Sequence, residues 1–285
     1  MDFRRSIATG IESLKASMGV PKPIVVQGIS QGTLVINAYK SFLMSLPEEQ
    51  RPDPDQLSFV LFGDPSNARN GLAAVVPVLQ SVLGVPGPAP DTPYDSLWLI
   101  REYDLFADFP DRPWNLLAVA NAVAGWVYVH PVYNGVDPTS EPGVLVDAAV
   151  NSQGGTDLYV LMPTRQLPLT MPLRQLGVPD RVVDDVDRLL RPVIDSAYDR
   201  RGYEPVTARD DVDLDQFELT REEPPADEPV PVSSGAKVKS GNKFSPGITV
   251  TAADPEHDDA DGESETVSET TDPEETGPDD AEAAA

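Results

Sequence analysis

The sequence has no cysteine among its 285 residues and only two histidines, His130 and His257. The absence of cysteine excludes a disulfide framework, a zinc–thiolate site and a cysteine nucleophile. Basic residues are also scarce, since 21 Lys and Arg stand against 47 Asp and Glu, for a formal net charge of −26. Binding to a nucleic-acid backbone needs Lys and Arg to displace counterions, so this composition argues against a nucleic-acid partner.

Long hydrophobic runs are missing as well. The stretch after Met1 lacks the continuous apolar core of a signal peptide, and its apolar residues recur at helical spacing instead. The most apolar run, residues 114–129, is too short to cross a bilayer and contains Asn115 and Asn121. We therefore expect neither a signal peptide nor a transmembrane segment.

The acidic charge is concentrated at the end of the chain. Residues 203–285 contain 24 Asp and Glu against 5 Lys and Arg, whereas residues 1–202 have a net charge of −7. The last segment has too few large apolar residues to offset the entropy of ordering. We predict a folded domain over residues 1–202 and a disordered acidic tail over residues 203–285. One cluster in this tail could bind a protein partner: Lys237, Lys239, Lys243 and Phe244.

The predicted folded domain alternates short β-branched runs with apolar stripes of helical spacing. We expect strands at 23–27, 57–62, 97–103 and 158–161. We expect helices at 3–18, 33–46, 71–84, 114–127 and 183–200. The remainder of 131–178 has the Gly- and Pro-rich composition of irregular structure. This order predicts an α/β domain with a mainly parallel sheet, in which functional residues gather at the carboxyl ends of strands.

A GxSxG motif joins the first predicted strand to the following helix. At such a junction the motif predicts a nucleophile elbow, in which Gly28 and Gly32 relieve the crowding around a sharply turned Ser30. The Ser30 hydroxyl would then project above the edge of the sheet. The backbone amide of Gln31, at the helix N-terminus, could donate to an oxyanion that develops on a bound carbonyl.

A serine nucleophile requires a base and an acid that orients the base. His130 is the only histidine outside the acidic tail, and in α/β-hydrolases the acid lies between the serine and the histidine in sequence. Asp64 follows the second strand, which is early for the acid, and its Gly-Asp-Pro context is typical of a turn. Asp104 follows the third strand directly, and Asp108 lies one turn later. We favour Asp104, because the sheet holds a residue at a strand end, with Asp108 as the alternative.

Several stretches together resemble the PE-PPE domain of mycobacterial proteins, a cutinase-like serine α/β-hydrolase. They are VVQGISQGTLV, LSFVLFGDPSNARNG, REYDLFADFPDRPWNLLAVANAVAG with YVH, and LPLTMPLRQLG ahead of DRLLRPVIDSAYDRRGY, roughly residues 22–203. The resemblance implies an esterase that acts on acyl esters with no metal or organic cofactor. It also implies a triad of Ser30, the aspartate of YDLFADFP and His130. It suggests the cell envelope, although this chain has neither a PE nor a PPE module.

The chain departs from this family pattern before the nucleophile strand. Hydrolases of this kind place strands and a second oxyanion donor there, and only about 20 residues are available here. Two interpretations follow: the chain is an N-terminally shortened form, or its sheet is smaller and its oxyanion hole incomplete. Loss of a sheet edge could also expose an unpaired strand.

Two functions follow from these features. One is a serine esterase whose apolar stretches 71–85 and 114–129, with Trp114 and Trp126, line a groove for an acyl-ester or lipid-like substrate. The other is a catalytically impaired, N-terminally shortened hydrolase fold that acts as an interaction module.

Overall fold

The computed structural model describes residues 3–19, 22–83, 87–133, 138, 142–205 and 248–252. The helices are α1 Phe3–Ser17, α2 Gln31–Ser45, α3 Leu72–Val75, α4 Val78–Leu83, α5 Leu116–Tyr128, α6 Met171–Gln175 and α7 Asp180–Asp195. The strands are β1 Ile24–Ile29, β2 Leu57–Phe62, β3 Ser96–Arg101, β4 Leu145–Val150, β5 Thr156–Met162, β6 Glu204–Pro205 and β7 Ile248–Ala252. Three short 3-10 turns, Glu48–Gln50, Pro54–Gln56 and Pro168–Thr170, join these elements.

The strands form one sheet in the order β6-β4-β5-β3-β2-β1-β7. Its central strands β5, β3, β2 and β1 pair in parallel, and β4, β6 and β7 add antiparallel pairs at the two sides. The central strands are mostly apolar and buried, as expected for parallel strands that are covered on both faces. The mainly parallel α/β architecture predicted from the sequence is therefore confirmed.

The edge beside β1 differs from the expectation. Instead of an unpaired edge, the outer side of β1 pairs antiparallel with β7, from Ile24 opposite Ala252 to Gly28 opposite Ile248. Residues 248–252 belong to the segment that we expected to be disordered, but their sequence ITVTA is rich in β-branched residues and can complete an exposed ladder. The rest of the predicted tail from residue 206 onward, including its Lys–Phe cluster and His257, lies outside the described residues.

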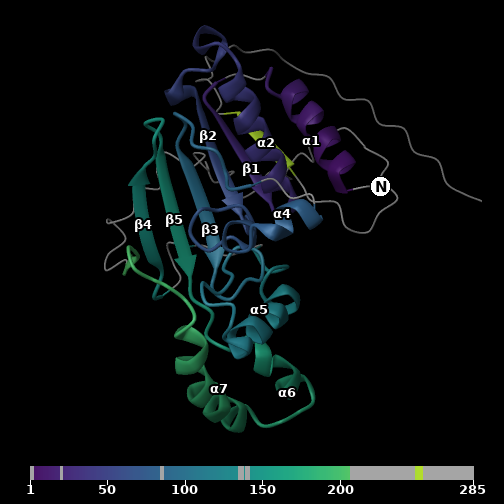
Figure 1. The fold of residues 1–285 in the computed structure, drawn as a ribbon, viewed down its shortest axis with the longest axis vertical. Helices are drawn as coiled ribbons and strands as arrows, with labels where there is room; N and C mark the ends of the chain where they lie inside the picture. Colours follow the sequence, from purple (N-terminus) through teal and green to yellow (C-terminus); the bar gives the residue numbers. More distant parts are fainter. Residues whose placement is uncertain are drawn as a thin grey trace, which may run out of the picture. The chain divides into compact units, whose positions relative to one another are not determined.

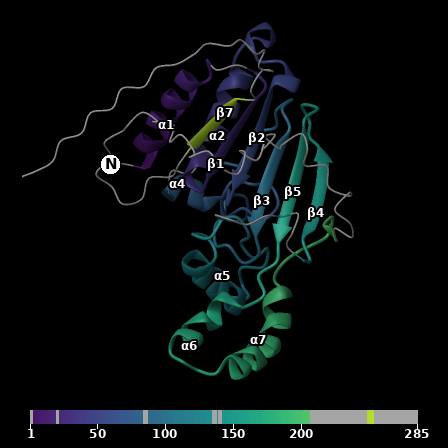
Figure 2. The ribbon, with the colours of Figure 1, turned by 180° about the vertical axis from the view of Figure 1, so that it is seen from behind.

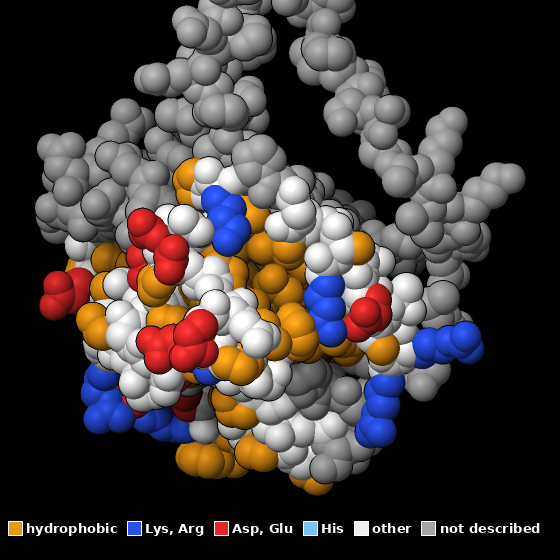
Figure 3. All heavy atoms as spheres, turned by 90° about the horizontal axis from the view of Figure 1, so that it is seen from above, with side chains coloured by type: hydrophobic (Ala, Val, Ile, Leu, Met, Phe, Trp, Pro, Cys, Tyr) orange, Lys and Arg blue, Asp and Glu red, His pale blue; other side chains and the backbone are white. Residues whose placement is uncertain are grey.

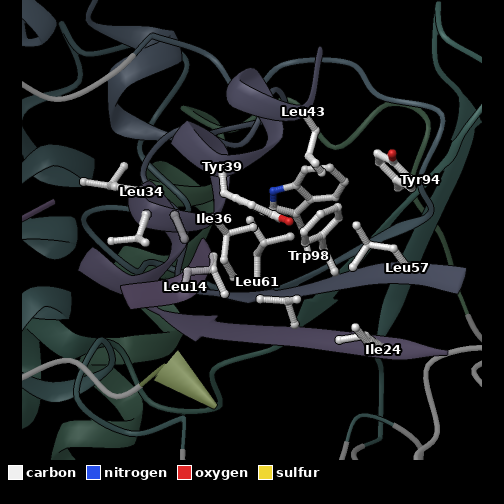
Figure 4. Packing of buried hydrophobic residues seen from close by; sticks show 14 of the residues in the cluster. Leu14, Ile24, Leu34, Ile36, Tyr39, Leu43, Leu57, Leu61, Tyr94 and Trp98 are labelled. Atoms are coloured by element: carbon white, nitrogen blue, oxygen red, sulfur yellow. The ribbon is translucent and has the colours of Figure 1, made fainter. Parts of the chain in front are cut away.

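One layer of the domain is formed by α1 and α2 against the sheet (Figure 1). Figure 4 shows the core between α2 and the strands, where the side chains of Ile36, Tyr39 and Leu43 lie near the indole of Trp98. The indole also stacks on the ring of Tyr159 at a centroid distance of 4.8 Å. This packing fixes α2, and with it the turn that precedes the helix, above the carboxyl end of β1.

The helices α5, α6 and α7 lie beyond the carboxyl ends of β3 and β5 (Figure 1 and Figure 2). A core cluster joins apolar residues of α5 and α7 to Tyr103, which lies just after β3. We expected irregular structure over most of 131–178, and this was wrong for β4 and α6. The LVDAAV sequence of β4 combines a charged residue with alanines, so its strand propensity is weak and its partner β5 determines its conformation.

Acidic and basic side chains are mixed on the described surface. Figure 3 shows Lys and Arg interspersed with Asp and Glu around a central group of hydrophobic side chains on the face that it displays. Within the described residues, no helix is both long enough and apolar enough to traverse a lipid bilayer.

Candidate active site

The turn between β1 and α2 has the geometry of a nucleophile elbow. Ser30 adopts φ 52° and ψ −114°, a left-handed conformation that a non-glycine residue rarely takes. A Cβ on Gly28 would lie 2.8 Å from the carbonyl carbon of Gly32, so only glycine fits at the first position of the motif. Gln31 is the first residue of α2, and its amide therefore has no carbonyl of the same helix to donate to.

His130 lies within hydrogen-bonding distance of both Ser30 and Asp104. Its Nε2 is 2.8 Å from the Ser30 Oγ, and its Nδ1 is 2.8 Å and 2.9 Å from the two carboxylate oxygens of Asp104. An ionised carboxylate only accepts hydrogen bonds, so Nδ1 carries the proton and Nε2 is free to accept the Ser30 hydroxyl proton. His130 is 9 % exposed, and Ser30 is half-buried.

The Asp104 carboxylate is fully buried and accepts two further hydrogen bonds. The backbone amide of Phe106 donates to Oδ1 at 2.9 Å, and the hydroxyl of Tyr133 donates to Oδ2 at 2.7 Å. The Tyr133 oxygen in turn accepts from the amide of Arg101 at the end of β3. Burial and the neighbouring Asp104 charge raise the pKa of Tyr133 well above its usual value, so the phenol remains a donor.

Asp108, the alternative acid, points elsewhere. It is also fully buried, but its two oxygens form a bidentate ion pair with Arg200, at 2.5 Å and 2.7 Å. Its Oδ2 also accepts the backbone amide of Tyr103 at 2.8 Å. The structure therefore places Asp104, and not Asp108, against His130.

Asp64 lies behind the elbow. Its carboxylate accepts from the Asn37 amide and the Trp98 indole at 3.0 Å each, and from the backbone amide of Ser66 at 2.9 Å. The Thr33 hydroxyl is 3.0 Å from the same carboxylate and 2.6 Å from the carbonyl oxygen of Ser30. Asp64 thus ties the first turn of α2 to β3, and it serves the elbow rather than the imidazole.

Two glycines that the sequence analysis did not single out shape the surroundings of His130. A Cβ on Gly63, which has φ +64°, would lie 3.1 Å from the imidazole Cε1. A Cβ on Gly125 would lie 1.9 Å from the carbonyl oxygen of Tyr103, and the Gly125 carbonyl accepts the amide of His130 at 2.9 Å. A glycine facing a backbone cannot be recognised from a single sequence, because the contact joins distant segments.

Apolar side chains lie beside the serine–histidine pair. The Phe106 ring is 4.7 Å from the imidazole centroid and 6.2 Å from the ring of Trp126 on α5. Leu72, Phe109 and Ala122 are buried in the same cluster. Of the stretches predicted to line a groove, residues 84–85 lie outside the described residues, and Trp114 is 75 % exposed.

Among the described side chains, no group of three or more His, Asp or Glu could hold a metal ion.

At the other side of the elbow, the Ser6 hydroxyl at the start of α1 lies 3.4 Å from the Gln31 side-chain oxygen.

A serine with left-handed backbone lies at the carboxyl edge of a mainly parallel sheet and is hydrogen-bonded to a later histidine–aspartate pair. This is the arrangement expected in an α/β-hydrolase-like fold. The model of the PE-PPE domain family matches residues 1–199, and the chain belongs to this family. No solved structure matches the chain.

Curated relatives from Mycobacterium tuberculosis include enzymes that act on esters. Esterase PE16 is 39% identical over 210 residues, which cover 71% of this chain and 39% of the relative. Diacyltrehalose acyltransferase Chp2 is 37% identical over 209 residues, covering 65% of this chain and 58% of the relative. SL1278 acyltransferase Chp1 is 37% identical over 213 residues, which cover 72% of this chain and 51% of the relative. The chain thus spans less than two thirds of the length of these relatives, and their names support an enzyme of the ester-acting kind.

Proposed function

We propose that the protein is a serine hydrolase that cleaves acyl esters through Ser30, His130 and Asp104. The observation that carries the proposal is the continuous hydrogen-bonded chain from the Ser30 hydroxyl through the imidazole to a buried carboxylate. The esterase and acyltransferase names of the relatives support the same chemistry.

The reaction would proceed through an acyl-enzyme. Ser30 Oγ attacks the ester carbonyl while His130 Nε2 takes its proton, and the carbonyl oxygen becomes an oxyanion near the Gln31 amide. The imidazolium then protonates the leaving alcohol. Water attacks the acyl-enzyme with His130 again as the base, which releases the carboxylic acid and restores the Ser30 hydroxyl.

Asp104 would hold the imidazole in the tautomer that this cycle requires. Its buried carboxylate lies on the Nδ1 side and stabilises the imidazolium that forms during each proton transfer. The Phe106 and Trp126 rings would receive the acyl chain, because they extend an apolar surface directly from the imidazole.

Acyl transfer is a second candidate for the same site. Two relatives are named acyltransferases, and an alcohol in place of water in the second half of the cycle would yield a new ester. The two outcomes differ only in the acceptor. Incubation with a labelled acyl ester and a polyol such as trehalose separates them, since transfer produces labelled acyl-trehalose and hydrolysis produces labelled fatty acid.

The proposal is tested by turnover of p-nitrophenyl esters of several chain lengths. We expect Ser30→Ala and His130→Ala to lower kcat/KM by at least about 1000-fold, because the nucleophile and its base act as a unit. Ser45→Ala, at the exposed end of the same helix α2, is the matched control and should retain the wild-type rate. Absence of turnover in the wild-type protein would favour the interaction-module hypothesis instead.

A further inference from the structure

We propose that Asp108 and Arg200 are positioning residues that hold the left-handed backbone of Tyr103 and thereby aim the Asp104 carboxylate at His130. The inference rests on the proposed catalytic roles of Asp104 and His130. It gives a function to the carboxylate that is fully buried beside the site yet makes its contacts away from the imidazole.

The backbone directly before Asp104 is strained. Tyr103 has φ +66°, although it carries a large and fully buried side chain. A non-glycine residue in this region costs free energy and persists only where its surroundings enforce it. Because Tyr103 directly precedes Asp104, its backbone conformation helps to set the direction in which the Asp104 side chain leaves the main chain.

The Asp108 carboxylate closes the turn around Asp104. It accepts the Tyr103 amide at 2.8 Å, while the Asp108 amide donates to the Asp104 carbonyl at 2.8 Å. These two hydrogen bonds fix the main chain on both sides of Asp104. A carboxylate buried in this way needs a compensating charge.

Arg200 supplies that charge from the far end of the domain, 92 residues along the chain. Its guanidinium forms the bidentate pair with Asp108 and lies 4.6 Å from the centroid of the Tyr198 ring. A planar fork that is both paired and stacked fixes the carboxylate in orientation as well as in charge.

The Tyr103 side chain is held by a second set of contacts. Its hydroxyl donates to Asp195 at 2.5 Å and accepts from Arg191 at 2.8 Å, and both partners lie on α7. The Tyr103 carbonyl meets Gly125, the residue whose own carbonyl accepts the His130 amide. The segment before Asp104 and the segment before His130 therefore touch where the Tyr103 carbonyl meets Gly125. A change in the Tyr103 backbone would alter the distance between the Asp104 carboxylate and the His130 imidazole.

Three variants test the proposal. Arg200→Ala removes the pair, Arg200→Lys keeps the charge without the fork, and Arg201→Ala removes a neighbouring charge that is 90 % exposed and paired with Asp199. We expect Arg200→Ala to lower kcat by about 10- to 100-fold with KM within about twofold, because misalignment acts on the chemical step. Arg200→Lys should restore part of the rate, and Arg201→Ala should match the wild type.

A proton NMR measurement reports the alignment without any need for activity. The Nδ1 proton between His130 and Asp104 should give a far-downfield signal, identified by its loss in His130→Ala. We expect this signal to move or broaden in Arg200→Ala and to stay unchanged in Arg201→Ala. A circular dichroism spectrum and a melting curve accompany each variant to show that it is folded.

The outcomes separate this proposal from the proposed function. If folded Arg200→Ala keeps the wild-type kcat and the wild-type signal, the positioning role is wrong while the esterase stands. A rise in KM with an unchanged signal also overturns the positioning role. If the wild-type protein hydrolyses no ester, the proposed function fails, and the downfield signal alone decides whether Arg200 aligns the pair.

Discussion

Buried charge is handled differently in two regions of this domain. At the carboxyl edge of the sheet, Asp64, Asp104 and Asp108 are fully buried, and each accepts at least three hydrogen bonds. Beneath α2, the Lys40 ammonium is equally buried, but it donates to Ser96 at 2.9 Å and otherwise faces the rings of Trp98 and Phe59.

The consequences of the two arrangements differ as well. At the carboxyl edge, full pairing coincides with left-handed backbone at Ser30 and Tyr103, so the contacts there support strained geometry. Around Lys40, burial lowers the pKa to about 8, even though carboxylates such as Asp157 act in the opposite direction. We infer that substitutions at the edge change activity, whereas substitution of Lys40 changes stability.

Among the residues that support the serine–histidine–aspartate cluster, the largest effect on activity is expected at Gly125. Gly125→Ala would place a Cβ 1.9 Å from the Tyr103 carbonyl oxygen, and neither backbone can yield without moving the acid or the base. We expect kcat/KM for a p-nitrophenyl ester to fall by at least about 100-fold, together with a lower melting temperature. Gly19→Ala, where a Cβ meets nothing within 4 Å, is the control. Wild-type turnover in Gly125→Ala would remove the basis for the alignment described here.

A smaller effect is expected at Tyr133. Tyr133→Phe deletes the hydroxyl that donates to Asp104 and accepts from the Arg101 amide. We expect kcat to fall by about 5- to 20-fold and stability to fall by about 1–3 kcal/mol, because a buried amide loses its acceptor. Tyr94→Phe, whose hydroxyl donates to the Pro52 carbonyl, serves as the matched control and should leave kcat unchanged. An equal fall in both variants would show that the loss is not specific to the site.

The smallest effect on activity is expected at Lys40. In the folded protein Lys40 has a pKa of about 8, below the usual 10.5. Burial therefore disfavours the charged amine, and folding costs free energy at any pH where the amine of the unfolded chain is protonated. Wild-type stability should therefore rise as the pH increases from 8 to 10.5. At pH 7 Lys40→Met should unfold at a higher denaturant concentration than the wild type. Its free energy of unfolding should be higher by about 1–2 kcal/mol, and its ester turnover should be unchanged.

The pH dependence supplies the check on Lys40. The stability difference between wild type and Lys40→Met should shrink as the pH is raised to 10.5, since the wild-type amine then loses its charge. A constant difference across this range would mean that packing, and not the buried charge, separates the two proteins.

Local sequence signals predicted the central part of the site. The GxSxG motif identifies Ser30 because the glycines that relieve the crowding of the turn lie within the same five residues. His130 stands out because histidine is rare in this chain. Asp104 could be favoured because it directly follows the predicted strand 97–103, and parallel strands bring such residues to one edge. The observed strand β3 ends three residues before Asp104, at Arg101. The catalytic roles of all three remain predictions.

The supporting residues could not be predicted, because their contacts join distant segments. Arg200 meets Asp108 across 92 positions, and nothing in the DRRGY sequence distinguishes it from its neighbour Arg201. The strand β7 was missed for a related reason, since its five residues lie in an acidic segment and gain their partner only from the exposed side of β1. Register and edge pairing are properties of the assembled sheet.

Labelling with a fluorophosphonate probe tests the central claim most directly, because the probe reacts only with an activated serine. The account predicts one adduct on the intact wild-type protein, mapped by mass spectrometry to the peptide that contains Ser30. It also predicts no adduct in Ser30→Ala and strongly slowed labelling in His130→Ala. An unlabelled wild-type protein, or an adduct on another serine that persists in Ser30→Ala, would contradict the account.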